Sequence, residues 1–161
     1  MSDKAIYPGT YDPITLGHIN ILEKAAKLFD QVILGVASYT AKQSLFSLDE
    51  RYDLCLGATQ HLPNVQVFKF EGLVVDFARS QGCRIMIRGL RAVSDFEYEL
   101  SLALTNTKLN PDIETIFMVP SLRYMYLSSS TIRQLAELGS NLDDFVPPCV
   151  AEALKAKLKG N

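Results

Sequence analysis

The chain has 161 residues, a formal net charge of −2 at pH 7, 48% hydrophobic residues and 21% charged residues. This balance is typical of a folded globular protein, and the lack of a basic stripe argues against a nucleic-acid partner. Three separated cysteines form no C-x-x-C pair, so they predict neither a disulfide framework nor a zinc site. No apolar run approaches the ~20 residues of a membrane-spanning helix, and no signal peptide precedes the first strand. We therefore expect a cytoplasmic protein with no membrane partner.

Short β-branched runs alternate with segments of helical periodicity along the chain. Strands are predicted at 5–7, 32–37, 65–70, 84–87 and 115–119, and helices at 17–29, 48–61, 73–81, 95–109, 131–138 and 149–158. Capping boxes are predicted at Ser47 with Glu50 and at Ser94 with Glu97. The pair Pro147-Pro148 is expected to open the final helix. The repeated strand–helix units predict one α/β domain, 1–161, with a Rossmann-like, doubly wound, five-stranded parallel sheet and C-terminal helices.

The first candidate site motif follows the first predicted strand, where such sheets bind ligands. Gly9 allows close approach of a ligand to the backbone, and Thr10 offers a hydroxyl and an amide. Thr15-Leu16-Gly17-His18 then opens a helix, whose positive end favours phosphate. A lone histidine at a helix start more often has no role, but Gly9-Thr10 before it favours a phosphate contact for His18. The second histidine, His61, is assigned no function.

The second motif is Arg88-Gly89-Leu90-Arg91, at the end of the fourth predicted strand. Two guanidinium groups around a glycine suit bidentate binding of phosphate, although surface arginines are the alternative. Lys42 lies in the loop after the second strand, which is expected to overhang the same crevice. Glu99 follows in the next helix and could accept ribose hydroxyls.

The third motif follows the fifth predicted strand. Four consecutive hydroxyl residues, 128–131, open a helix there. One of them is expected to cap the helix, and the others could cradle a triphosphate. Tyr124 just before them could flank an adenine ring.

Together these motifs closely resemble the phosphopantetheine adenylyltransferases of the nucleotidyltransferase superfamily, over nearly the whole chain. The most specific stretches are 5–10, 12–18, 87–92 and 95–99. The resemblance implies transfer of the adenylyl group of ATP to 4′-phosphopantetheine by direct in-line displacement, giving dephospho-coenzyme A and pyrophosphate. It further implies a homohexamer that uses Mg²⁺ carried with ATP and is inhibited by coenzyme A.

The resemblance also implies individual roles. The implied catalytic residues are His18, Lys42 and Arg91. The implied ATP-binding residues are Thr10, Tyr11, His18, Gly89, Leu90, Arg91, Glu99, Tyr124, Met125, Tyr126, Leu127, Ser128, Ser129 and Ser130. The implied residues for the pantetheine substrate are Thr10, Lys42, Val74, Arg88, Leu102 and Asn106. No protein ligand for a metal is expected. Position 74 is often Leu or Met in the family, and position 124 is often Trp.

Two other functions compete with this interpretation. One is a nucleotidyltransferase of the same superfamily whose acceptor is a mononucleotide or an alcohol phosphate. Thr15-x-Gly17-His18 does not discriminate between the two, whereas Lys42 and residues 88–91 favour pantetheine. The other is a module that binds ATP without turnover, which the fold alone would permit. A second phosphate position at Lys42 and Arg88 argues against that alternative.

Overall fold

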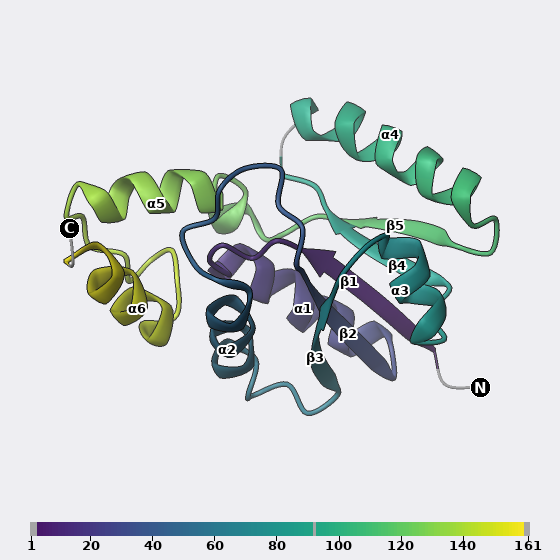
Figure 1. Ribbon diagram of the computed structural model, residues 1–161, viewed down its shortest axis with the longest axis horizontal. Coiled ribbons are helices and arrows are strands. Elements are labelled where there is room, and N and C mark those ends of the chain that lie inside the picture. Colours follow the sequence, from purple (N-terminus) through teal and green to yellow (C-terminus); the bar gives the residue numbers. More distant parts are fainter. Residues whose placement is uncertain (1–2, 92, 160–161) are drawn as a thin grey trace.

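The computed structural model describes residues 3–91 and 93–159, and a parallel sheet lies at its centre (Figure 1). Its strands are β1 (Lys4–Gly9), β2 (Gln31–Ala37), β3 (Val65–Phe70), β4 (Ile85–Gly89) and β5 (Glu114–Met118). They lie in the order β3-β2-β1-β4-β5, and every neighbouring pair is parallel. The predicted Rossmann-like, doubly wound sheet of five strands is confirmed.

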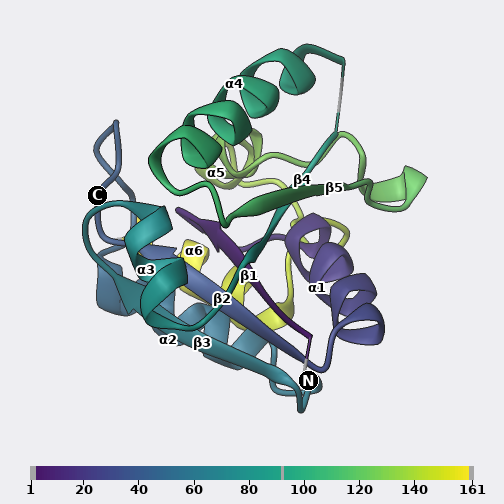
Figure 2. The ribbon, with the colours of Figure 1, turned by 90° about the vertical axis from the view of Figure 1, so that its right-hand side faces the viewer.

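Helices cover both faces of the sheet because the chain reverses its direction of travel across it. The helices are α1 (Leu16–Leu28), α2 (Leu48–Ala58), α3 (Val74–Ser80), α4 (Val93–Leu109), α5 (Ser129–Glu137) and α6 (Pro148–Leu158), with a short 3-10 helix η1 (Leu122–Tyr124). Right-handed crossovers place α1 and α2 on one face while the chain moves from β1 to β3. The return to β4 and β5 then places α3 and α4 on the other. Figure 2 shows α1 and α3 on opposite sides of the strands.

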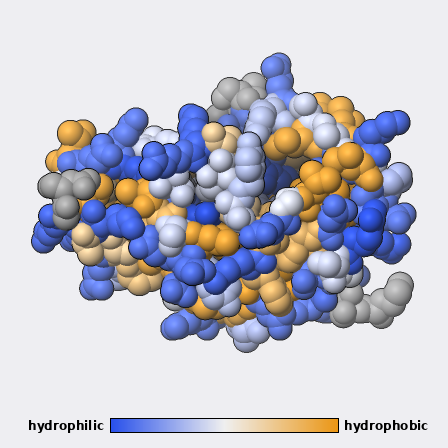
Figure 3. All heavy atoms as spheres, in the orientation of Figure 1, coloured by the Kyte–Doolittle hydropathy of each residue, from blue (hydrophilic) through white to orange (hydrophobic). Residues whose placement is uncertain are grey.

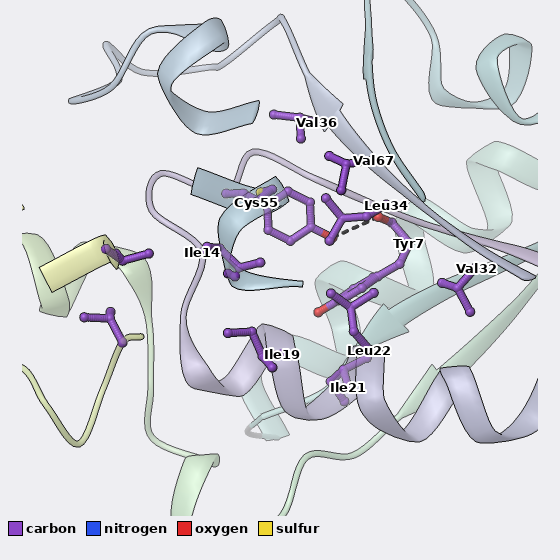
Figure 4. Close-up of a cluster of buried hydrophobic side chains, with 14 of the residues drawn as sticks. Tyr7, Ile14, Ile19, Ile21, Leu22, Val32, Leu34, Val36, Cys55 and Val67 are labelled. Atoms are coloured by element: carbon purple, nitrogen blue, oxygen red, sulfur yellow. Dashed lines mark hydrogen bonds between the residues drawn. The ribbon is translucent and has the colours of Figure 1, made fainter. Parts of the chain in front are cut away.

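Alternating residues of the strands supply two apolar cores. Tyr7 and Leu34 are buried on the first face together with Leu22 of α1, as Figure 4 shows, and residues of α2 and α6 complete this core. Ile6 and Ile33 point to the second face, where residues of α3 cover them. The period of two in the strands is what sends neighbouring residues to opposite cores.

Several predicted boundaries shift in ways that bear on the site. β4 extends to Gly89, so Arg88 lies inside the strand rather than after it. α4 begins at Val93, one residue before Ser94. The predicted capping box of Ser94 with Glu97 depends on the Ser94 side chain, which lies outside the described residues. The capping box of Ser47 and the Pro147-Pro148 helix start are both confirmed.

Within the described residues, no helix has the length and apolar character needed to cross a membrane.

A buried arginine joins the ends of the central strands. Arg51 of α2 is only 2% exposed. Its Nη1 donates to the carbonyl oxygens of Thr10 and Ala37, each at 2.8 Å, and its Nε donates to that of Phe46 at 3.2 Å. One cation therefore binds three backbone carbonyls: one just after β1, one at the end of β2 and one just before α2. The hydrogen bonds offset the desolvation of the guanidinium and hold the carboxyl edge of the sheet together.

Replacement of this cation by an apolar side chain of similar length should destabilise the fold. We expect Arg51→Met to lower the free energy of unfolding by about 2–4 kcal/mol, because three buried carbonyls lose a charged donor. Arg79→Met is the matched control, since Arg79 makes an exposed pair with Asp76, and its effect should stay within about 0.5 kcal/mol. Urea unfolding of both variants measures the difference. Equal effects would contradict the clamp assigned to Arg51.

Candidate functional site

A cleft of about 550 Å³ opens at the carboxyl ends of the central strands. It lies where the sheet order reverses between β1 and β4, which is the position that doubly wound sheets use for ligands. The turn after β1, the loop after β2, the end of β4, the start of α4 and the start of α5 all contribute to its walls. Residues from five separate segments of the sequence thus meet in one cavity.

Most of the residues singled out from the sequence line this cleft. They are Thr10, Tyr11, His18, Lys42, Arg88, Gly89, Arg91, Glu99, Tyr124, Leu127, Ser128, Ser129 and Ser130.

Six of the singled-out residues are not part of the cleft lining. Leu90 donates its backbone N–H to Met118, and the ring of Tyr126 packs edge-on against Phe145. Met125 directly precedes Tyr126 and also lies outside the lining. The other three are Val74 on α3 and Leu102 and Asn106 on α4.

Val74 and Asn106 lie on the second face of the sheet. Val74 packs against the second core, and the Asn106 amide lies 3.5 Å from the Met86 sulfur of that core. These residues of α3 and α4 therefore lie on one face of the sheet, beyond the walls of the cleft.

His18 is held at the start of α1 by a capping box that the sequence analysis did not identify. The backbone N–H of Thr15 donates to Nδ1 of His18 at 3.0 Å, and the backbone N–H of His18 donates to the Thr15 hydroxyl at 3.3 Å. Because Nδ1 accepts a backbone proton, the neutral ring carries its own proton on Nε2. The ring of Tyr11 packs edge-on against the imidazole, with ring centroids 4.9 Å apart. His18 therefore offers one oriented N–H donor.

The surroundings of His18 keep its ring neutral. Burial, followed by the charges of Arg91 and Arg88, lowers the pKa of His18 from 6.5 to about 3. An imidazolium would lose hydration in the cleft and face two guanidinium groups. At neutral pH the side chain is thus a hydrogen-bond donor without a formal charge.

Arg88 and Glu99 form a bidentate ion pair inside the cleft. The distances are 2.7 Å from Nε to Oε2 and 2.8 Å from Nη2 to Oε1, and Glu99 is 8% exposed. Arg88 Nη1 also donates to the carbonyl oxygen of Pro8 at 3.0 Å. These contacts use three of the five guanidinium N–H groups, which leaves two donors for a ligand. Glu99 therefore orients Arg88 from α4.

Two more arginines of the cleft also lie close to carboxylates. Arg91 Nε is 3.3 Å from Asp95, and Nη1 of Arg91 donates to the carbonyl oxygen of Leu127 at 2.6 Å. Arg133 Nη1 is 3.6 Å from the Asp12 carboxylate and donates to the Asp12 carbonyl oxygen at 2.6 Å. Sequence reasoning assigned no role to Arg133, although its helical spacing of three and four from Ser130 and Ser129 puts it on the same side of α5.

Lys42 differs from these arginines in having no acidic partner. Among the ion pairs of residues 3–91 and 93–159, none involves Lys42, although the residue lines the cleft. Its loop turns on itself through a hydrogen bond from the Thr40 hydroxyl to the Lys42 carbonyl, at 2.7 Å. The cleft thus has an exposed ammonium group on the side of the β2–α2 loop.

The hydroxyl residues at the start of α5 make different contacts. Ser128 is the N-cap, accepting from the backbone N–H of Thr131 at 3.2 Å, as the sequence predicted for one of them. Ser129 donates to the carbonyl oxygen of Pro13 at 2.8 Å, which joins α5 to the turn after β1. Ser130 is exposed at the cleft, 3.3 Å from Arg133. The first turn of α5 therefore presents one hydroxyl and an arginine to a bound anion.

The fold and the site together define a nucleotidyltransferase: an α/β protein with a cationic cleft at the switch point and a T-x-G-H helix start. The family model described as "Cytidylyltransferase-like" matches residues 6–135. The chain therefore belongs to the cytidylyltransferase-like family.

Solved structures share this fold at low sequence identity. A putative nicotinate-nucleotide adenylyltransferase from Vibrio parahaemolyticus has a TM-score of 0.75 and 18% identity, over 98% of this chain and 95% of its own. Plasmodium falciparum nicotinic acid mononucleotide adenylyltransferase, complexed with NaAD, has a TM-score of 0.68 and 16% identity, over 94% of each chain. A bifunctional NMN adenylyltransferase/ADP ribose pyrophosphatase from Francisella tularensis, complexed with AMP and a Mn ion, has a TM-score of 0.73 and 15% identity, over 99% of this chain and 50% of its own.

The lowered pKa of His18 has a measurable consequence for stability. The unfolded chain takes up a proton at this residue near pH 6.5, whereas the folded chain does so only near pH 3. The unfolded state therefore binds more protons between these values, and stability from this residue is lost as the pH falls. Urea unfolding should show that the free energy of unfolding of the wild type falls relative to that of His18→Gln as the pH drops from about 7 to 5. A difference independent of pH would contradict the neutral ring.

Proposed function

We propose that this protein transfers the adenylyl group of ATP to 4′-phosphopantetheine, giving dephospho-coenzyme A and pyrophosphate. The observation that carries the proposal is a pair of anion-binding positions that face one cleft. His18 and the start of α1 form the first, and Lys42 with Arg88 forms the second. A transfer between two phosphates needs both positions at once, because two anions must be held together against their repulsion.

The acceptor itself supplies the nucleophile. A phosphate monoester has a second pKa of about 6, so its oxygen is largely ionised at pH 7 and needs no general base. The geometry of His18 suits this chemistry, since Nδ1 already accepts the Thr15 N–H and the remaining Nε2–H can only donate. We propose that this donor stabilises charge on the transferring phosphoryl group. Lys42 and Arg88 anchor the attacking phosphate in line with the leaving pyrophosphate.

The remaining site residues divide between the two substrates. Arg91 and the start of α5 hold the leaving pyrophosphate, with Thr10 and Tyr11 beside the phosphates. Gly89, Leu90, Glu99 and the stretch 124–127 complete the ATP site. Val74, Leu102 and Asn106 contact the pantetheine arm. Support for the last assignment comes from α3 and α4, which stand on the same face of the sheet.

We further propose that Mg²⁺ arrives bound to ATP. No group of three or more His, Cys, Asp or Glu side chains suitable for a metal occurs among the residues that the structure describes. The carboxylates of Asp12, Asp95 and Glu99 in the cleft each lie within ion-pair distance of an arginine. A metal held by the nucleotide phosphates suits such a site, and it would reduce the negative charge that the acceptor meets.

The same proposal includes assembly and regulation. A homohexamer is supported by exposed apolar side chains on α4, where Phe96, Leu100 and Leu104 follow one another at intervals of four. Apolar residues also gather over α4 and β5 in Figure 3. Coenzyme A is proposed as an inhibitor because it contains the acceptor and the adenylate in one molecule. We also propose that the protein is cytoplasmic.

An acceptor panel tests the activity directly. Purified protein, ATP and Mg²⁺ are mixed with 4′-phosphopantetheine, nicotinate mononucleotide, nicotinamide mononucleotide or glycerol 3-phosphate. We expect pyrophosphate and an adenylylated product only with 4′-phosphopantetheine, identified by mass spectrometry. Turnover with a mononucleotide alone would keep the mechanism and overturn the substrate. Intact ATP with every acceptor, from folded protein that binds ATP, would favour a nucleotide-binding module without turnover.

The role of His18 can be separated from ATP binding. We expect His18→Ala to lower kcat by about 10²-fold or more, because the donor acts on charge that grows in the transition state. The dissociation constant for ATP should change little. His61→Ala is the matched control, because His61 pairs with Glu23 on the surface, and its kcat should equal that of the wild type. Near-normal turnover in His18→Ala would remove His18 from the mechanism.

A further inference from the structure

The loop that carries Lys42 is anchored at both ends by residues outside it. The backbone N–H of Ser38 donates to the carbonyl oxygen of Phe70, and Arg51 binds the carbonyl of Ala37 at the same end. Between these points and α2, residues 38–46 form no helix or strand. Lys42 lies near the middle and is exposed. The position of the ammonium group therefore also depends on how the other end of the loop, just before α2, is held.

Asp12 holds that end. Its two carboxylate oxygens each accept one backbone N–H, from Leu45 and from Phe46, both at 2.9 Å. Asp12 is 4% exposed, so these bonds lie away from competing water. A carboxylate that accepts two adjacent backbone amides fixes both the position and the direction of the chain there. The contact joins the turn after β1 to the loop after β2, across 33 residues of sequence.

Two arginines flank this carboxylate. Arg133 of α5 lies 3.6 Å from the carboxylate and donates to the Asp12 carbonyl. Arg51 binds the carbonyl oxygens of Thr10 and Phe46 on either side of the same contact. The anchor is thus held from the N-terminal turn, from α2 and from α5. Asp12 lines the same cleft as Tyr11 and His18.

We propose that Asp12 is a positioning residue that holds residues 38–46, and with them Lys42, at the acceptor side of the cleft. The proposal rests on the function proposed above only for the acceptor role of Lys42, since the anchoring of the loop stands on its own contacts. Asp12 does not act on the reacting atoms. It acts through the backbone of the loop.

The loop itself provides a readout that needs no substrate. In the wild type, the amides of Leu45 and Phe46 should exchange with deuterium at least about tenfold more slowly than those of Ala41 and Gln43. Asp12→Asn keeps one acceptor oxygen but turns an NH₂ toward the second backbone N–H. We expect exchange across residues 38–46 to rise by about tenfold or more in this variant, with the sheet unchanged. Asp30→Asn is the matched control, because Asp30 accepts the backbone N–H of Asp3 outside the cleft.

Kinetics separate positioning from electrostatics and from general stability. Removing a negative charge from the cleft would by itself tighten phosphate binding, whereas displacement of Lys42 weakens it. We therefore expect Asp12→Asn to raise KM for the acceptor about tenfold, with little change in ATP affinity. Lys42→Ala should raise the same KM, and the double variant should be no worse than Lys42→Ala alone within about twofold.

The outcomes distinguish the two proposals. Unchanged exchange across residues 38–46 in Asp12→Asn, or multiplicative effects in the double variant, would overturn the positioning role of Asp12. Fast exchange at Leu45 and Phe46 in the wild type would overturn it without any variant. Faster loop exchange in Asp12→Asn, combined with an unchanged acceptor KM in Lys42→Ala, would support the anchor and overturn the acceptor role of Lys42.

Discussion

The reversal of strand order between β1 and β4 is the constraint on which the rest of the structure depends. Right-handed crossovers send the helices that follow β1 and β2 to one face and those that follow β3 and β4 to the other. The loops at the carboxyl ends of β1 and β4 therefore diverge and leave space between them. Five segments of the sequence reach that space, so its chemistry is assembled from distant residues.

Paired charges shape the cleft that this reversal opens. Arg88 and Arg91 each lie near a carboxylate of α4, and Arg133 lies near the carboxylate of Asp12 in the turn after β1. Each pair limits the rotation of a long side chain, so less side-chain entropy remains to be lost when an anion binds. Lys42 has no such partner among the residues described, and its placement depends on the backbone of its loop. Preorganisation thus comes from side chains on one wall and from main-chain anchors on the other.

His18 shows how a structural contact selects a chemical role. The Thr15 N–H is one of the donors that a helix start leaves unpaired, and Nδ1 of His18 accepts it. That bond leaves Nε2 as the donor, while burial and two nearby guanidinium groups keep the ring neutral. The same bond that begins α1 therefore excludes His18 as a general base from Nδ1. In the proposed reaction the phosphate nucleophile is already ionised near neutral pH, so such a base is unnecessary.

The sequence by itself determined the five strands, their alternation with helices and three motifs at strand ends, because periodicity and capping chemistry are local properties. It also brought most of the cleft residues to attention. It assigned no role to Asp12, Arg51 or Arg133. Only the tertiary structure decided those points, because backbone carbonyls and amides carry no sequence signature and all but one of these partners lie 14 to 121 residues away.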